Sequence, residues 1–195
     1  MKLVKKPVSK LPFFKRGDSN VIEIKPITFG DFNKLPYAKK ESESLTDAEL
    51  FQQYKAAIFA CTDINEGEFA TLTAPDFNTL SKDIDKFINS SSDVLRGEPI
   101  TGNTFEFDLL HPFENDVGET ISRIKFKAPL VAHSEKLAEI DDAHEREHFM
   151  FRCACGLDEE DVDRMSMNDY LAIKPQVGAF FTLTADYFRP RTFKA

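Results

Sequence analysis

The sequence predicts a mostly helical α+β fold: two tandem copies of a small β element, a strand or hairpin, each followed by three to four helices. The main observation is a pattern of like residues that one gapless shift superposes at helical spacing. It pairs Asp76, Phe77, Leu80, Ile84, Phe87 and Ile88 with Asp169, Tyr170, Ile173, Val177, Phe180 and Phe181. The same shift pairs Ile64 with Leu157, Phe69 with Val162, Leu72 with Met165 and Thr73 with Ser166. A duplicated module favours a scaffold or binding protein over an enzyme, because an enzyme needs only one catalytic site and gains nothing from a second copy of the module.

Composition supports a folded core and excludes several function classes. The chain has 195 residues, 42% of them hydrophobic, with 19 Phe and no Trp, which is enough for one ordinary domain or two small ones. A net charge of -8 and a pI near 5.1 argue against a general nucleic-acid binder, which needs a basic face. No apolar run approaches the length of a membrane span. Three cysteines, an odd count, favour free thiols in a reducing compartment, so we expect a soluble cytosolic protein.

The first half of the chain divides into an arm and a module. Residues 1–20 form a basic extended arm in which Pro7 and Pro12 oppose regular structure. The first module, 21–88, begins with a strand at 21–25 that lacks an obvious hairpin partner. Four helices are expected next. The first covers 29–35, and the second starts at a capping box of Thr46 and Glu49 and reaches Cys61. The third covers 66–72, and Thr73 starts the fourth.

The second half repeats this plan after a polar linker. Residues 89–103 are the linker, 104–182 the second module and 183–195 an aromatic and basic tail. Two alternating runs, 105–109 and 120–126, predict a β-hairpin around a Gly-bearing connection. The helices that follow are 132–140, 143–155, 159–165 and one that Ser166 starts. Pro175 lies inside the last helix and is expected to kink or divide it.

One motif suggests a metal site. His144-Glu-Arg-Glu-His148 matches H-E-x-x-H, which on a helix places both imidazoles on one face as zinc ligands, with Glu145 positioned to activate a bound water. The composition around it is that of a solvated face. No convincing third ligand follows, because 159–161 look like the acidic first turn of a helix. Cys153 and Cys155 are too close together for a zinc knuckle.

The internal repeat also argues against this motif. The first copy carries Phe51 and Lys55 where the second has His144 and His148, so the module does not need ligands there. We therefore expect no metal, no cofactor and no catalytic residue, and His144 and His148 remain the candidates if a metal binds. No Gly-rich phosphate loop or nucleophile elbow is present. The sequence favours a protein that is not an enzyme.

The second copy resembles a known family in the order of its parts. A hairpin at 105–110 and 124–129, with Pro112 and Gly118, comes first, and a helix that ends at Gly156 and Leu157 follows it. The last part is a helix that carries Asp169, Tyr170, Ile173, Val177, Phe180 and Phe181. This order is similar to that of the small tail assembly chaperones of tailed bacteriophages, and to the related baseplate-hub assembly chaperones. The resemblance covers 104–181 and, more faintly, 21–88. Family members are usually a single unit, whereas this chain looks tandem.

The resemblance implies a non-enzymatic role in virion morphogenesis in the host cytoplasm. Such chaperones bind the tape-measure protein and help tube or hub subunits gather on it, so the implied partners are phage tail proteins, with no nucleic acid and no membrane. An acidic protein with apolar grooves between helices can mask amphipathic helices, while its charge keeps the complex dispersed. The candidate contact residues are aromatic side chains near the C-terminus: Phe181, Tyr187, Phe188 and Phe193.

Three other functions stay open at this point. The chain could be a structural baseplate or tail subunit, which would remain associated with the virion. It could be a zinc-dependent hydrolase that acts through His144, Glu145 and His148. It could be a regulator that binds a host protein. The sequence leaves the partner and the oligomeric state undetermined.

Overall fold

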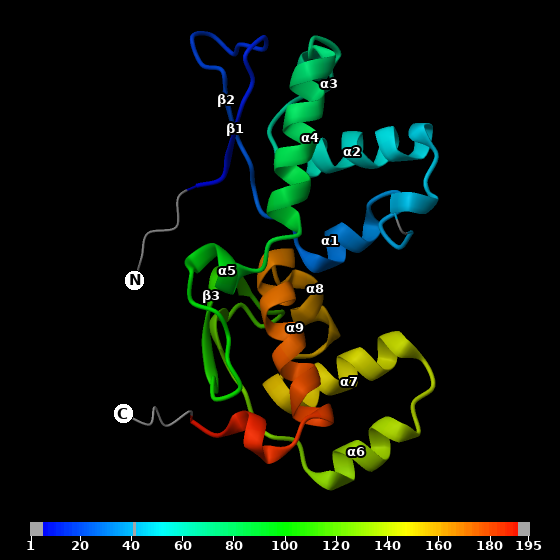
Figure 1. Cartoon of the computed structure of the whole chain (residues 1–195), viewed down its shortest axis with the longest axis vertical. Helices are drawn as coiled ribbons and strands as arrows, with labels where there is room; N and C mark the ends of the chain where they lie inside the picture. The colour runs from blue at the N-terminus through cyan, green and yellow to red at the C-terminus, as the bar shows by residue number, and fades with distance from the viewer. Residues whose placement is uncertain (1–5, 41, 191–195) are drawn as a thin grey trace. The chain divides into compact units, whose positions relative to one another are not determined.

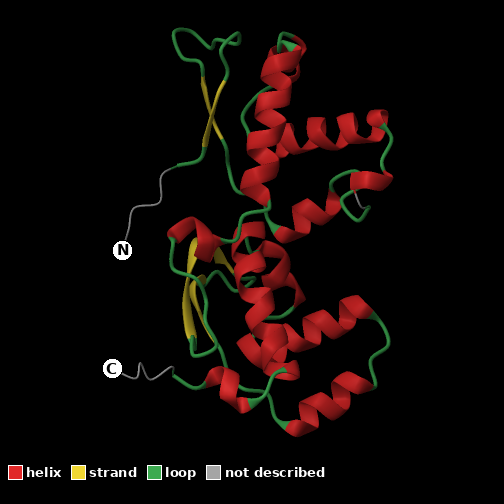
Figure 2. Cartoon of the chain, in the orientation of Figure 1, coloured by secondary structure: helices red, strands yellow, loops and turns green. Residues whose placement is uncertain are grey.

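A computed structural model describes residues 6–40 and 42–190, and it divides the chain into two compact units, Met1–Ser90 and Ser91–Ala195. The fold is α+β and mostly helical, as the sequence predicts, and each unit has a two-stranded antiparallel sheet followed by helices (Figure 2). Within the described residues no helix is both long enough and apolar enough to cross a membrane.

The first unit starts with a hairpin and continues with helices. Strand β1 (Val8–Lys10) pairs antiparallel with β2 (Val21–Glu23) (Figure 1). The helices are α1 (Phe29–Lys34), the 3₁₀ turn η1 (Ser42–Ser44), α2 (Asp47–Cys61), α3 (Glu66–Ala70) and α4 (Ala74–Ile88). The predicted capping box is present, since the amide of Glu49 donates to Thr46 Oγ1 and the amide of Thr46 donates to the Glu49 carboxylate.

The hairpin of the first unit corrects the sequence analysis on the arm. The segment predicted as an extended arm contains β1, which is the hairpin partner that the first module was expected to lack. Leu11, which follows β1, is fully buried, and Ser9 donates to Asp83 of α4 at 2.6 Å. Alternation alone could not reveal this strand because it is three residues long and lies between Pro7 and Pro12.

The second unit has the same order of elements after one added helix. Helix α5 (Ser92–Arg96) comes first, and β3 (Glu106–Glu114) pairs antiparallel with β4 (Thr120–Lys125). The following elements are α6 (Val131–Ala138), α7 (Ala143–Cys155), α8 (Glu159–Arg164), α9 (Met167–Thr182) and the 3₁₀ turn η2 (Ala185–Phe188). The segment predicted as a linker therefore includes a helix, and Arg96 of that helix donates to the carbonyl of Leu109 in β3 at 2.6 Å.

The core of each unit lies among its hairpin and two helices, α2 and α4 in the first unit and α7 and α9 in the second. In the first unit Ile22, Ile58 and Leu80 are buried, and in the second Ile124, Phe151 and Ile173 are buried. Helix α9 runs from Met167 to Thr182 across Pro175, so of the two expected effects, a kink or a division, the division does not occur. Its buried neighbours Ile173 and Val177 hold this segment against the rest of the unit, which offsets the backbone hydrogen bond that proline removes.

Candidate functional site

An irregularity in the pairing of β3 with β4 fixes the position of α9, which lines the candidate binding groove. Pairing with β4 shifts between Asp108 and Phe113, and the amides of Leu110 and His111 leave the ladder there. Both amides donate to the carboxylate of Asp169, at 2.8 and 2.9 Å, and Ser166 Oγ donates to it at 2.8 Å. Asp169 is fully buried. It therefore fixes the start of α9 against the hairpin, which sets the position of every later residue of α9.

An apolar groove of about 540 Å³ lies between α7 and α9. Its lining residues are Ala143, Arg146, Glu147, Met150, Phe151, Lys174, Pro175, Val177 and Gly178. A side chain added at Gly178 would meet open space, because no atom lies within 4 Å of the position a Cβ would take. The groove is therefore open at the position of α9 that carries no side chain.

The charged side chains at the rim of this groove are held by partners within the unit. Lys174 donates to Glu147 at 2.9 Å, and the Tyr170 hydroxyl also donates to Glu147. Burial, and then this carboxylate, raise the pKa of Tyr170 above its usual range. Arg146, also on α7, donates to the carbonyls of Leu137 and Ile140 at 2.6 and 2.9 Å. The rim is thus fixed while the apolar floor stays open.

A groove lined at matching positions is also present in the first unit. It lies among α1, α2 and α4 and has a volume of about 210 Å³. The shift that superposes the two halves places Arg146, Met150 and Gly178 on three residues of this first groove, which are Gln53, Ala57 and Asp85. The same part of each unit is hollowed, and the hollow is wider in the second.

Three of the four predicted contact residues lie in the described part of the chain. Phe181 is half-buried and Tyr187 is 45% exposed. Phe188 is half-buried because its ring stacks on Phe180, with centroids 4.6 Å apart. Phe193 lies outside the described residues. The described tail therefore folds back on the second unit and leaves Tyr187 as its most accessible aromatic side chain.

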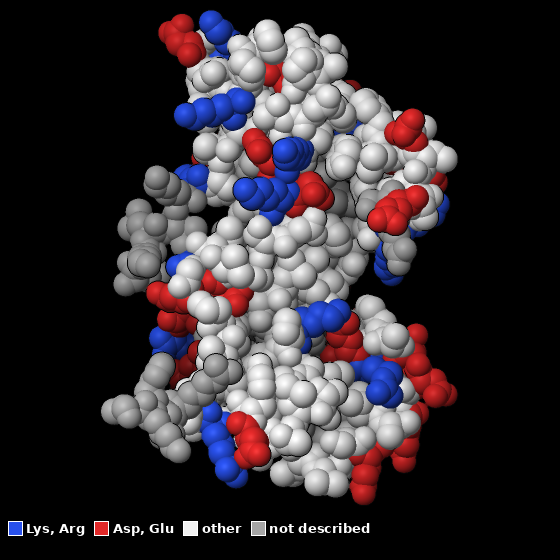
Figure 3. Space-filling model, viewed as in Figure 1, with Lys and Arg blue, Asp and Glu red and all other residues white. Residues whose placement is uncertain are grey.

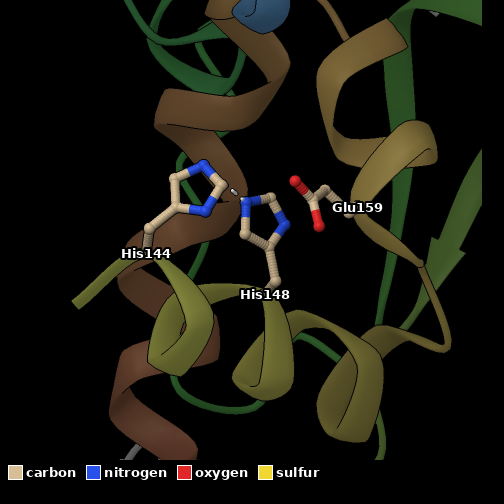
Figure 4. Close-up of side chains that lie close together, drawn as sticks. All are labelled: His144, His148 and Glu159. Atoms are coloured by element: carbon tan, nitrogen blue, oxygen red, sulfur yellow. Dashed lines mark hydrogen bonds between the residues drawn. The ribbon is translucent and has the colours of Figure 1, made fainter. Parts of the chain in front are cut away.

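The H-E-x-x-H motif lies on α7, as its spacing predicts, and the structure adds a third residue to it. His144 Nε2 and His148 Nε2 are 3.1 Å apart. A carboxylate oxygen of Glu159 joins them, with the ligand atoms of all three residues within 4.8 Å of one another (Figure 4). Burial, and then the neighbouring His144, lower the pKa of His148.

The sequence analysis did not single out Glu159 as a third candidate ligand, because its position beside the two histidines depends on tertiary structure. Gly156 ends α7 in the left-handed conformation, with φ of 72°, which only glycine adopts without strain. The chain then turns back into α8 beside α7. Asp158 caps α8 by accepting the amide of Asp161 at 2.9 Å. The Glu159 carboxylate is therefore not needed as a cap and faces the two imidazoles.

The three cysteines do not add reactive groups to these sites. Burial raises the pKa of Cys61 and of Cys155 to about 12, and it also raises the pKa of Cys153. A thiol in this state carries little thiolate, which is the reactive and metal-binding form. This fits the interpretation of the cysteines as free thiols that fill apolar space.

Comparison with known proteins bears on the second unit. Residues 106–182 match a family model described as phage tail assembly chaperone proteins, E, or 41 or 14. This part of the chain is similar to phage tail assembly chaperones. The resemblance inferred from the sequence is thereby confirmed over these residues, which are less than half of the chain. No curated protein and no solved structure matches the chain.

The bounds of the match coincide with structural elements. It starts at Glu106, the first residue of β3, and ends at Thr182, the last residue of α9. The matched segment is therefore the hairpin with the helices up to the end of α9, and it contains the groove, Asp169 and the histidine pair. Sequence reasoning expected apolar grooves between helices but did not locate this one, and it missed the role of Asp169, because each depends on two elements that are distant in the sequence.

Proposed function

We propose that this protein is a phage tail assembly chaperone that binds tape-measure or baseplate-hub proteins during tail morphogenesis in the host cytoplasm. The observation that carries the proposal is the family match, which spans one complete hairpin-and-helix module. The family is generally non-enzymatic, so the expected mode of action is binding rather than catalysis. Tail proteins are the partners that the family suggests.

The groove between α7 and α9 is the proposed binding surface, and its occupant is an amphipathic helix of the tail protein. Met150, Val177 and the side of α9 at Gly178 offer an apolar floor to the apolar stripe of such a helix. Arg146, Glu147 and Lys174 on the rim can contact the flanking polar residues of the helix. A groove at matching positions in the first unit supports the view that binding is a property of the module.

The surface charge is consistent with a chaperone that keeps an aggregation-prone partner dispersed. The net charge of the chain is -8, and on the face that Figure 3 shows, acidic and basic side chains of the described residues are scattered among uncharged surface. Like-charged complexes repel one another in solution. Tyr187, which is 45% exposed near the end of the second unit, is proposed as a further contact outside the groove.

The experiment is co-expression of the full chain with the tape-measure and hub proteins of the same phage, followed by affinity capture and mass spectrometry of both the complex and purified virions. Capture of either protein, with the chain absent from virions, supports the proposal. Retention of the chain in virions would make it a structural subunit instead. If neither tail protein is captured, the proposed partner class is wrong.

A pair of substitutions at Gly178 tests the groove itself. Gly178→Phe fills the groove with a ring and is expected to abolish capture. Gly178→Ala adds a methyl group in open space and removes the entropic cost of a helical glycine, about 1 kcal/mol, so it should bind like the original chain with equal or greater stability. Equal capture by both variants would show that the tail protein does not bind in the groove between α7 and α9.

A further inference from the structure

The cluster of His144, His148 and Glu159 has the donors of a transition-metal site. We propose that these three residues bind one Zn²⁺ ion, which links α7 to α8 in the second unit. Two imidazole nitrogens and one carboxylate oxygen are ligands that zinc accepts. The inference does not depend on the proposed chaperone role.

The geometry brings the ligand atoms close to coordination distance. Nitrogens bound to a tetrahedral zinc at about 2.0–2.1 Å are separated from each other by roughly 3.3 Å. The two Nε2 atoms are 3.1 Å apart, and the ligand atoms of all three residues lie within 4.8 Å of one another. Small rotations of the exposed Glu159 and His144 side chains complete the set. Figure 4 shows the three side chains facing one another from two helices.

A second observation points to a ligand. His148 is 5% exposed, and its Nδ1 has no hydrogen-bond partner among the described residues. A buried imidazole that donates or accepts only toward another imidazole is poorly satisfied. Zinc bound at Nε2 would replace the contact between the two imidazoles and fix the proton of His148 on Nδ1, which would then be an N–H donor on the side of the Glu159 carboxylate (Figure 4).

The first unit shows what fills the same place without ligands. Its corresponding residues are Phe51, Lys55 and Glu66. Phe51 packs against Phe69 and Phe77, with ring centroids 6.5 and 5.0 Å apart. Lys55 lies over the Phe69 ring at 5.3 Å. These contacts join α2, α3 and α4, whereas the second unit has polar side chains at the first two positions. A bound metal supplies the missing connection.

The proposed site is a cross-link and includes no chemical step. Three protein ligands leave a fourth position for water. Glu145, the residue that would act as a base in a hydrolase, is exposed and is not part of the three-residue group.

The test uses the full chain, purified without a polyhistidine tag and freed of metal by a chelator. Zn²⁺ is titrated against a chromophoric competitor, and thermal unfolding is followed with and without Zn²⁺. We expect one Zn²⁺ per chain and a rise in Tm with zinc, because a ligand that binds the folded state stabilises it. Cobalt(II) in place of zinc should give the absorption spectrum of a tetrahedral site.

Two variants remove ligands and two serve as matched controls. His144→Ala and Glu159→Gln are expected to weaken zinc binding by more than about tenfold and to abolish the rise in Tm. Glu160→Gln and Glu145→Gln, which change neighbouring exposed carboxylates, should bind zinc like the original chain. Both ligand variants alter exposed side chains, so their metal-free stability should remain near that of the original chain.

The proposal is overturned by any of three results: no saturable binding of one Zn²⁺ per chain, binding that persists in both ligand variants, or equal loss in the Glu160→Gln control. The last result would show a diffuse attraction to acidic surface rather than a site.

Discussion

In the second unit, Asp169 at the start of α9 accepts two backbone amides from the hairpin, those of Leu110 and His111. In the first unit, Asp76 at the start of α4 accepts one, that of Phe13 at 3.4 Å. The strand registers place Pro12 where the second unit has Leu110, and proline has no amide to donate. This explains why Asp76 Oδ2 is buried without a partner among the described residues.

Other backbone contacts agree between the units. The amide of Lys25, after β2, donates to the carbonyl of Cys61 at the end of α2, at 2.7 Å, and the amide of Lys127 donates to the carbonyl of Ala154 in α7 at 2.8 Å. The two units thus share a frame, meaning the same backbone arrangement of hairpin and helices, and they differ in the side chains that this backbone carries. The lesson is that the frame depends on backbone contacts that many sequences can make, while grooves and polar clusters depend on individual residues.

Aromatic packing is one such difference. The first unit gathers Phe rings among α2, α3 and α4, with Phe59 and Phe69 centroids 5.3 Å apart. In the second unit Phe180 of α9 contacts Phe105, Phe126 and Phe188 near the hairpin. The many phenylalanines of the chain therefore fill different ends of the two units.

The prediction with the largest expected loss of stability tests whether the cores of the two units contribute equally to the free energy of unfolding. Leu80 and Ile173 are matched by the repeat, and both are fully buried. Leu80→Ala and Ile173→Ala should each lower the free energy of unfolding by about 2–5 kcal/mol, because each leaves a cavity. Urea denaturation combined with hydrogen exchange assigns each loss to its unit. Lys82→Ala, on the exposed face of α4, should change stability by less than about 0.5 kcal/mol.

A loss in one unit with little change in the other would contradict the comparison. It would show that one unit folds loosely and that its buried residues contribute little.

The second prediction uses the buried aspartates. Asp169→Ala leaves two part-buried amides without an acceptor and should cost about 3 kcal/mol, while Asp76→Ala removes one long hydrogen bond and should cost about 1 kcal/mol. The measurement is the midpoint of urea unfolding for each variant. Equal losses would mean that the proline at position 12 does not weaken the first unit.

The third prediction restores the missing donor. Pro12→Ala provides an amide at the position that faces Asp76 Oδ2. Because the substitution also loosens the unfolded chain, its effect is measured in a double-mutant cycle with Asp76→Ala. We expect a coupling free energy of about 1 kcal/mol between the two positions. A coupling near zero would show that the new amide does not reach the carboxylate.

The sequence predicted features that depend on neighbouring residues. The capping box of Thr46 and Glu49 and the helix starts at Thr73 and Ser166 were correct, because a cap needs a few consecutive residues. Strand β1 and helix α5 were missed. A short strand is defined by its partner, and the start of α5 at Ser92 lies in a polar segment that resembles a loop.

The candidate sites show the same limit. The spacing of His144 and His148 on one helix was predictable, because residues four apart share a face. The position of Glu159 was not, since it depends on the turn at Gly156 and on the packing of α8 against α7. The contacts proposed for Phe181, Tyr187, Phe188 and Phe193 remain predictions.

The smallest expected effect concerns ion pairs that differ between the units. In the first unit Arg16 donates to Glu68 at 2.7 Å and to Asp63 at 2.9 Å, and it joins the hairpin to residues distant in the sequence. These bonds hold the pKa values of both carboxyl groups below their usual range. A lowered pKa in the folded state stabilises the fold above the unfolded pKa, and this contribution is lost as the pH falls through the folded pKa.

In the second unit Arg123 pairs with Asp108 and Glu106 inside its own hairpin, and the pKa of Asp108 is lowered. Arg16→Gln should therefore lower Tm at pH 7 more than Arg123→Gln does, because it releases a contact between separate elements. The deficit of Arg16→Gln should disappear as the pH falls toward 3, where the carboxylates of the original chain take up protons. It should also shrink in 1 M salt, because these groups are partly exposed and salt screens their attraction. A deficit that stays constant from pH 7 to pH 3 would mean that Arg16 acts through the packing of its side chain rather than through its charge.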